Sequence, residues 1–364
     1  MTSLERVLCA LRGEPADRRA FTLTLSLYGA RLTGCPVRDY FTIPSRYLEG
    51  QREVVGLVDP DILFTPFVLP FEALAYGGEE VWLDRFPPNV RKPPFRAPDA
   101  AEPLGEGLLL DPGVGYLIES ARLLAGEFGA DKPVCAVVTA PVDLPAMLLG
   151  IEAWLEILLF DQQRASALMD LAEDHFQRLT SAFFDAGATF VATPVMFANL
   201  RLVTPPLLEK TILPALARSF GQCRGPVVFH HGGNRIEDHL ELYAGLPNVA
   251  GFVLDPRDSL KRGRGTLGPG RLLLGNLNGP GLARMQPDDA RARAAAILAD
   301  RATDPHFILA SSHADVPFDT DPRTLLAIRQ AVLETGGAAR RTSWPSAAAS
   351  SRPNWRPWPR VSRV

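Results

Sequence analysis

The sequence predicts a single α/β domain that folds as a (β/α)8 TIM barrel with a helical cap at its N-terminal end. Eight short apolar runs alternate with longer segments of helical periodicity over residues 1–337. The first run is not followed by Gly-x-Gly-x-x-Gly, and no Gly-x-x-x-x-Gly-Lys-Ser/Thr occurs, so an open nucleotide-binding sheet is disfavoured. A chain of 364 residues that is 46% hydrophobic is also large enough for one barrel.

Each element follows from a local pattern. An amphipathic helix is predicted over residues 2–13, where four apolar residues share one face. The eight predicted strands are the short apolar runs at 21–27, 61–67, 133–138, 189–192, 227–230, 249–254, 271–274 and 307–310. Helical periodicity is found at 38–55, 113–129, 151–187, 205–221, 237–244, 288–300 and 324–334. The Gly-, Trp- and Pro-rich stretch 72–94 is predicted to be an excursion with a small hairpin, and the glycine-rich stretch 263–270 a loop.

Charge and cysteine usage limit the classes of partner. The net charge is −3, and the last 27 residues hold six arginines and no acids, so the rest of the chain is more acidic than that value. An acidic body argues against nucleic-acid binding. Residues 338–364, rich in Arg, Pro and Trp, are predicted to form a disordered tail because they show no periodicity.

The compartment is predicted from features that the sequence lacks. It contains no apolar run of about 18 residues, as a membrane span requires, and no signal-peptide pattern. The cysteines are scattered and form no Cys-x-x-Cys pair, which is typical of reduced thiols. They are Cys9, Cys35, Cys135 and Cys223. We expect a cytoplasmic protein that does not bind membranes.

Residues 227–234 (VVFHHGGN) are the most informative stretch for function. A short strand ends in His230 and His231, at the end of a parallel strand where ligands bind in α/β folds. Because successive strand residues face opposite sides, only one of the two histidines is expected to face a central site. Two glycines then allow a tight turn, and Asn234 is predicted to cap a helix that starts at Arg235.

Other polar residues are predicted at the same rim of the barrel. We predict catalytic roles for His230, His313, Asp255 and Arg31. We predict substrate contacts for Tyr28, Thr193, Asn276 and His231. His230 and His313 are the predicted metal ligands, with Asp255 or Asp315 as a third, because zinc and iron accept imidazole and carboxylate ligands.

Simpler interpretations of these residues stay open. A strand-end histidine is also compatible with a buried side chain that bonds a backbone carbonyl, and a histidine moves protons without a metal. Asp255 is equally compatible with a helix cap or an ion pair with Arg257. Asp143 and Glu72 are expected to be surface or capping residues.

Several segments, in order along the chain, carry a family resemblance. They are residues 4–7 (LERV), 11–15 (LRGEP), 72–79 (EALAYGGE), 184–188 (FDAGA), 275–278 (GNLN) and 320–322 (TDP). With them the chain resembles the uroporphyrinogen decarboxylase superfamily, which includes zinc-dependent methyltransferases that move methyl groups from corrinoid proteins to thiols. The resemblance covers about residues 3–336 and implies a (β/α)8 barrel.

The resemblance also carries implications for individual residues. The decarboxylase branch has Arg-Gln-Ala-Gly-Arg after the first strand, and this chain keeps only Arg31 of that motif; Pro66 replaces an aspartate that binds the tetrapyrrole. These losses argue against uroporphyrinogen turnover, although His313 stands where that branch has a histidine. The methyltransferase branch has His-x-Cys after strand five. Here His230 is kept, Gly232 replaces that cysteine, and His313 lies near the position of a second one.

The sequence therefore predicts a divergent methyltransferase-like enzyme that acts on a small anionic substrate, whose carboxylate Arg31 would hold. The resemblance implies zinc or another divalent metal, a corrinoid protein as methyl donor and partner, and is compatible with a homodimer. Two alternatives stay open: a decarboxylase or other lyase without metal, and a non-catalytic corrinoid- or tetrapyrrole-binding protein. The leading hypothesis requires that histidines far apart in the chain converge on one cavity.

Overall fold

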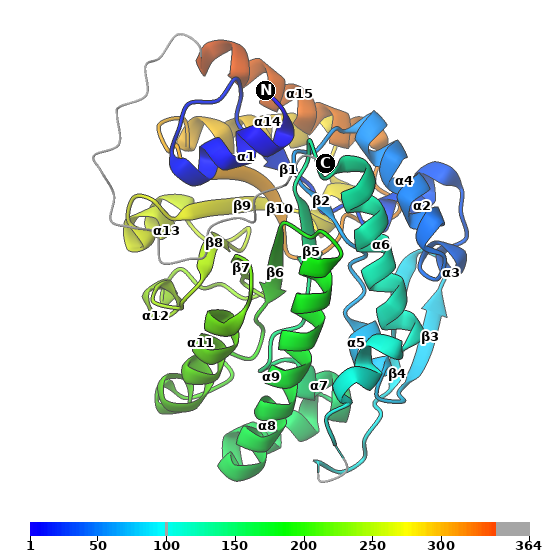
Figure 1. Cartoon of the computed structure of the whole chain (residues 1–364). Coiled ribbons are helices and arrows are strands. Elements are labelled where there is room, and N and C mark those ends of the chain that lie inside the picture. Colours follow the sequence, from blue (N-terminus) through cyan, green and yellow to red (C-terminus); the bar gives the residue numbers. More distant parts are fainter. Residues whose placement is uncertain (99–100, 340–364) are drawn as a thin grey trace.

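The computed structural model, which describes residues 1–98 and 101–339, is a barrel of parallel strands surrounded by helices (Figure 1). The strands are β1 (Phe21–Thr22), β2 (Leu63–Phe64), β5 (Val134–Val137), β6 (Phe190–Pro194), β7 (Val227–His230), β8 (Val249–Val253), β9 (Leu272–Asn278) and β10 (Phe307–Ser312). Their order in the sheet is β1-β10-β9-β8-β7-β6-β5-β2. The predicted TIM barrel is confirmed.

Backbone and side-chain contacts help to close the barrel between β1 and β2. The amide of Asp61 donates to the carbonyl of Phe21 at 2.8 Å, and Thr22 Oγ1 donates to the carbonyl of Ile62 at 2.9 Å. The fully buried Asp61 carboxylate accepts from the Phe21 amide at 2.9 Å. It also pairs with Arg18 at 2.5 Å and Arg6 at 3.2 Å. A buried charge is stable only when it is paired, and here the carboxylate on the β2 side of the seam takes its partners from the β1 side.

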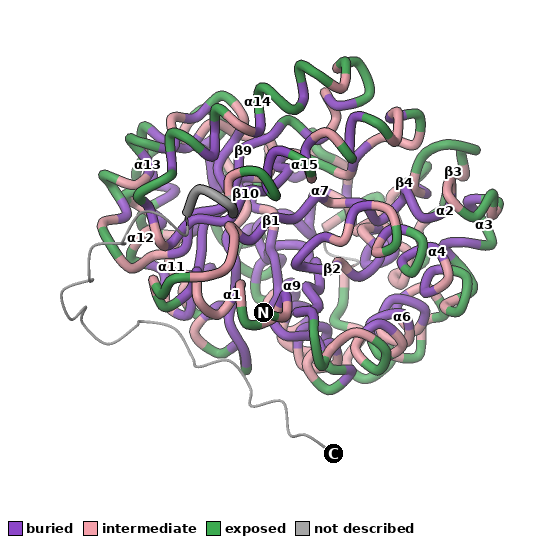
Figure 2. The backbone as a smooth tube through the Cα atoms, turned by 90° about the horizontal axis from the view of Figure 1, so that it is seen from above, coloured by how far each residue is buried: buried purple, intermediate pink, exposed green. Residues whose placement is uncertain are grey.

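Strand alternation separates two cores. Residues that point inward fill the lumen, and they come mostly from alternate strand positions such as Phe190, Ala192 and Val228. Helix α1 (Ser3–Arg12) closes the N-terminal end with Val7 and Leu11, which belong to the same cluster. In Figure 2 the central strands are buried, and the exposed positions lie on the surrounding helices and loops. The other end of the barrel, at the carboxyl ends of the strands, is not covered by α1 and can hold a functional site.

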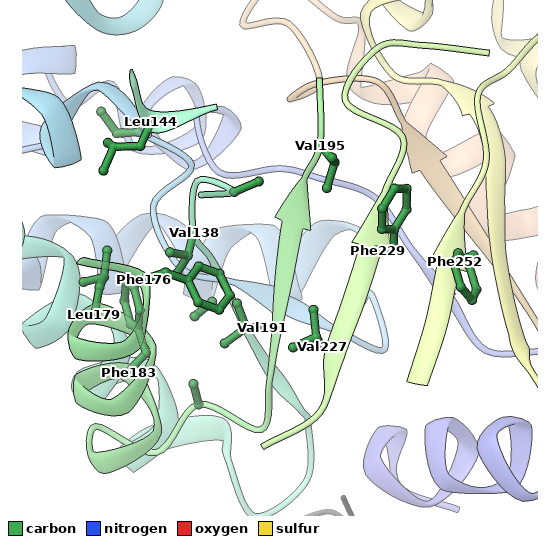
Figure 3. Packing of buried hydrophobic residues seen from close by; sticks show 14 of the residues in the cluster. Val138, Leu144, Phe176, Leu179, Phe183, Val191, Val195, Val227, Phe229 and Phe252 are labelled. Atoms are coloured by element: carbon green, nitrogen blue, oxygen red, sulfur yellow. The ribbon is translucent and has the colours of Figure 1, made fainter. Parts of the chain in front are cut away.

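Outward-pointing residues pack under the helices. Figure 3 shows part of this outer core, formed by Phe176, Leu179 and Phe183 of α9 with Val191 of β6, Phe229 of β7 and Phe252 of β8. The outer helices are α2 (Tyr28–Thr33), α3 (Val37–Tyr40), α4 (Pro44–Leu57), α5 (Pro70–Leu74), α6 (Pro112–Phe128), α7 (Leu144–Leu149), α8 (Ile151–Phe160), α9 (Gln162–Asp185), α10 (Pro205–Leu207), α11 (Leu213–Gln222), α12 (Leu240–Ala244), α13 (Leu260–Leu267), α14 (Pro287–Asp300) and α15 (Pro322–Ala339).

Local predictions are confirmed in most places and wrong in two. The predicted hairpin is formed by β3 (Glu79–Leu83) and β4 (Phe86–Lys92). The stretch predicted as a loop at 263–270 lies mostly in α13, because Ser259 caps that helix and Gly263 allows close packing against Leu254. Asn234 does not cap a helix, since α12 begins only at Leu240; its side chain bonds Asn199 and Met196 instead.

The C-terminal boundary lies close to the predicted one. Helix α15 extends to Ala339, whereas the tail was predicted to begin at 338; the rest of that tail lies outside the described residues. Among the residues that the structure describes, no helix is long and apolar enough to cross a membrane.

Because Asp61 helps to close the barrel, we expect Asp61→Asn to destabilise the fold strongly. The substitution leaves Arg6 and Arg18 without their shared buried carboxylate, so we expect a loss of about 3 kcal/mol in the free energy of unfolding. Urea denaturation measures it. Asp17→Asn, which removes a partly exposed partner of Arg6, is the matched control and should cost less than half as much. Equal losses in the two variants would contradict this role of Asp61.

Candidate active site

Three strand ends bring polar side chains to the open rim of the barrel. His230 is the last residue of β7 and His231 follows it, Asp255 lies two residues after β8, and His313 comes directly after β10. Strands β7, β8 and β9 are neighbours, and β9 is followed by β10. Residues separated by more than eighty positions therefore lie at one place.

His231, Asp255 and His313 form a compact set. Each offers one ligand atom, and these atoms all lie within 4.8 Å of one another. Asp255 Oδ2 is 3.2 Å from His313 Nδ1 and 3.5 Å from His231 Nδ1. The rings of His231 and His313 are 5.4 Å apart between centroids. The predicted convergence of two strand-end histidines is present, together with a carboxylate.

The Asp255 carboxylate is buried and charged. Burial works to raise its pKa, but hydrogen bonds from the side chain and amide of Arg257 outweigh burial and hold the pKa below its ordinary value. Arg257 Nε donates to Oδ1 at 2.7 Å and Nη2 donates to Oδ2 at 2.9 Å. The ion pair with Arg257 considered from the sequence is therefore present. It neutralises one side of the carboxylate and leaves Oδ2 also facing the two imidazoles.

His231 is held as a neutral imidazole with a defined tautomer. Burial, followed by the charges of His230 and His313, holds its pKa far below the ordinary value. Backbone amides lie near both ring nitrogens, that of Gly233 3.0 Å from Nδ1 and that of His313 3.3 Å from Nε2, and a neutral imidazole accepts at only one of them. With the proton on Nδ1 the ring makes two hydrogen bonds, because Nδ1–H donates to the Asn234 carbonyl at 3.1 Å and Nε2 accepts from His313; with the proton on Nε2 only the Gly233 bond forms. We therefore assign the proton to Nδ1. An Nδ1–H held by a carbonyl is the usual support of a histidine that binds metal through Nε2.

His230 lies beside this set but is held in the opposite tautomer. Its Nδ1 accepts from the amide of Gly232 at 3.1 Å, which places the ring proton on Nε2. Its ring stacks on His231 with 4.4 Å between centroids. Burial, with the charge of His313, lowers its pKa to about 4. The structure thus differs from the predicted His230/His313 metal pair, because the compact set contains His231 and the Nε2 of His230 carries a proton.

A pocket of about 30 Å³ opens at this rim, a volume that holds only a few small atoms. His230 and His313 both line it, with Thr24 and apolar side chains of β2, β5 and β6. Alternation explains why His230 and not His231 faces the pocket. Val228, two positions before His230, belongs to the lumen.

The predicted contacts of Arg31 and Tyr28 with substrate stay predictions, and the structure gives both side chains other partners. Arg31 Nη1 donates to the carbonyls of Phe318 and Thr320 at 2.7 and 2.5 Å. Tyr28 Oη donates to the Thr320 carbonyl at 2.6 Å. Arg31 also stacks over the Tyr28 ring. The two side chains fix the loop that follows β10.

Thr193 and Asn276 have different positions from those expected. Thr193 is fully buried, by alternation with Ala192 it points away from the lumen, and it is not among the residues that line the pocket; its contact with substrate stays a prediction. Asn276 Nδ2 donates to the carbonyls of Asp255 and Asp258 at 3.0 and 2.8 Å. It therefore shapes the turn that carries Asp255.

Three other carboxylates support the rim from inside. Asp315, proposed as an alternative metal ligand, accepts from the amides of Ser26 and Leu27, and burial raises its pKa to about 7. Asp143 and Glu72, expected at the surface or as caps, are buried. Asp143 accepts from the amides of Met196 and Phe197; Glu72 accepts from Thr139 and contacts His175 at 2.9 Å. Sequence reasoning missed these roles, because the amide partners of Asp143 are far away in the chain and those backbone donors carry no sequence signal.

The residues present fit a divalent cation. His313 Nδ1 is buried and, in the described part of the chain, has no hydrogen-bond partner, since it faces Asp255 Oδ2 without hydrogen-bond alignment. Their 3.2 Å separation is close to the ~3.3 Å between neighbouring ligands of a tetrahedral zinc ion with bonds of about 2.0–2.1 Å. Two imidazoles and a carboxylate with a position left open are typical of catalytic zinc and non-haem iron sites.

Comparisons with known proteins identify the family of this chain. The family model described as uroporphyrinogen decarboxylase matches residues 2–335. A methylcobamide:CoM methyltransferase, MtbA of Methanosarcina acetivorans, is 25% identical over 221 residues; the match covers 58% of this chain and 64% of the relative, so the chain spans less than two thirds of it.

Two solved structures share the fold. A methyltransferase from Methanosarcina mazei superposes with a TM-score of 0.82 at 20% identity, covering 92% of this chain and 99% of that one. A B12-independent methionine synthase from Shewanella sp. W3-18-1 gives a TM-score of 0.53 at 12% identity, covering 83% and 91%. At these identities the likeness establishes the barrel alone.

The lowered histidine pKa values predict loss of stability in acid. Between the ordinary value of 6.5 and about 4, the unfolded chain binds a proton at His230 that the folded chain does not bind, so stability falls as pH falls through this window. We expect His230→Gln to reduce the loss in the free energy of unfolding between pH 7 and 5 by about 2 kcal/mol, measured by urea denaturation at both pH values. His239→Gln, outside the set, is the control. An unchanged pH dependence in His230→Gln would refute the prediction.

Proposed function

The chain belongs to the uroporphyrinogen decarboxylase family, and we propose that it is a methyltransferase-like enzyme with a divalent metal site formed by His231, Asp255 and His313. The observation that carries the proposal is the compact set of two imidazoles and one carboxylate at the rim of the barrel, with a buried His313 nitrogen lacking a partner among the described residues. The methylcobamide:CoM methyltransferase among its relatives supports the reaction class.

The proposed ligands are His231 through Nε2, His313 through Nδ1 and Asp255 through Oδ2; a bound ion would replace the hydrogen bond that His231 Nε2 accepts from the His313 amide. A divalent ion held there would lower the pKa of a coordinating thiol and keep it as a nucleophile. No thiolate of the protein takes part, so the ligand set is less electron-rich than the His-x-Cys set implied for the methyltransferase branch. The ion is zinc or another divalent metal that accepts nitrogen and oxygen ligands.

The protein's own groups prepare the site. Arg257 holds the Asp255 charge in place, and Asn276 fixes the turn between Asp255 and Asp258. The Asn234 carbonyl orients His231. The walls of the pocket are mainly apolar, and a substrate that displaced water from between them would strengthen the electrostatic interactions inside. These contacts preorganise the rim before a substrate enters.

We propose a small thiol as methyl acceptor and a methylated corrinoid, carried by a partner protein, as donor. The thiol loses its proton to solvent, the sulfur–carbon bond forms, and the cobalt–carbon bond breaks with both electrons remaining on cobalt. The homodimer compatible with the sequence stays a prediction, as do the metal-free lyase and the non-catalytic binding protein.

Measurements of metal affinity distinguish the proposed ligands from His230, the neighbouring histidine. We expect His231→Gln and His313→Ala to weaken Co²⁺ binding by about 100-fold, and His230→Gln by less than about 3-fold. Equilibrium dialysis with metal analysis measures the affinity, and His239→Gln is the matched control. Loss of binding in His230→Gln with retention in His231→Gln would show that the ligand set is wrong.

Methyl transfer is tested with methylcobalamin and 2-mercaptoethanol under anaerobic conditions. The absorbance of methylcobalamin should fall with protein present, and Asp255→Asn should reduce the rate by about 10–100-fold because one charged ligand is lost. Far-UV circular dichroism confirms folding of the variant. A wild-type protein that binds metal but shows no turnover with any thiol would contradict the reaction class.

A further inference from the structure

Among the residues that the structure describes, those lining the pocket beside the compact set include no lysine or arginine. Its walls are mainly apolar and come from Phe64, Phe67, Val137, Ala192 and Pro194. Its polar lining residues are Thr24, His230 and His313. Burying an anion between such walls is unfavourable unless a cation faces it.

Two arginines near the strand ends have other partners. Arg31, the residue expected to hold a substrate carboxylate, donates from Nη1 to two backbone carbonyls. Arg257 donates from Nε and Nη2 to Asp255, and its Nη2 also contacts the Gly233 carbonyl at 3.1 Å. The charge of Arg257 is therefore matched by a carboxylate before any substrate arrives.

Two neutral donors face the pocket instead. The Gly232 amide occupies Nδ1 of His230, so Nε2–H is the free donor of that ring. Ser311 Oγ accepts from the Thr24 amide at 2.8 Å and donates to Thr24 Oγ1 at 3.4 Å, which leaves the Thr24 hydroxyl proton available.

We propose that this pocket selects an uncharged thiol: a short apolar body with one neutral oxygen that accepts from His230 Nε2–H and Thr24 Oγ–H. This inference rests on the proposed function, since it places the sulfur of the acceptor at the neighbouring metal ligands. It replaces the anionic substrate expected from the sequence. It also separates this chain from a relative that acts on CoM, whose sulfonate is permanently charged.

A matched pair of thiols tests the proposal on the full-length protein loaded with Co²⁺. 2-Mercaptoethanol and 2-mercaptoethanesulfonate differ only in the group at the far end from sulfur, and thiolate binding to cobalt gives a new charge-transfer absorption. We expect 2-mercaptoethanol to bind at least about 10-fold more tightly, because the sulfonate has no cation in the pocket. Equal or tighter binding of the sulfonate would overturn the uncharged-substrate inference while leaving thiol binding intact.

Variants of His230 test whether its Nε2–H donor causes the preference for the uncharged thiol. His230→Phe should lose about 5–10-fold in affinity for 2-mercaptoethanol but little for ethanethiol, which has no oxygen, whereas His230→Gln keeps a donor and most of the preference. Equal losses for both thiols in His230→Phe would overturn the role of Nε2–H. Absence of a spectral change with every thiol would instead overturn the proposed function. If the protein does not bind cobalt, calorimetric titration of the metal-free protein measures its affinity for 2-mercaptoethanol and for 2-mercaptoethanesulfonate. Tighter binding of the sulfonate would refute the inference.

Discussion

The buried charge of Asp255 is the constraint on which the candidate site depends. A carboxylate with no exposed surface needs partners on every side. Arg257 supplies one side with two side-chain hydrogen bonds, and the imidazoles of His231 and His313 face the other. Because Arg257 reaches in from a more exposed position, the imidazole side is where a cation would complete the pairing. The buried Asp255 carboxylate thus gives a reason for the rings of His231 and His313 to face it.

The fold makes this arrangement available through alternation and closure. Alternate strand residues fill the lumen, and α1 covers its N-terminal end, so the carboxyl rim is where polar side chains gather. Asp61 adds a buried ion-pair network at the seam between β1 and β2. The same alternation directs His230 into the pocket and Thr193 away from it. Strand alternation therefore determines which strand-end side chains face the pocket and which do not.

Much of this could be predicted from the sequence. The eight strands, the hairpin and the boundaries of β7 are strong local patterns, and the strand ends identified His231, Asp255 and His313 as residues of one rim. The choice between His230 and His231 could not be predicted, because it depends on which ring nitrogen accepts a backbone amide: Nδ1 of His230 accepts from Gly232, and Nε2 of His231 accepts from His313, which is far away in the chain. The helix α13 was missed because glycines lower helix propensity, and the packing of Gly263 on Leu254 overrides it. The partners of Arg31 are carbonyls nearly three hundred residues away, which leave no local signal.

The location of a bound ion tests the central claim most directly. Crystals of the protein grown with Zn²⁺ and measured on both sides of the zinc absorption edge give an anomalous difference map. The account predicts one strong peak about 2.0–2.2 Å from His231 Nε2, His313 Nδ1 and Asp255 Oδ2, with His230 outside the coordination shell. A peak bound by His230 without His231, or a zinc-loaded crystal with no peak at this rim, would contradict it.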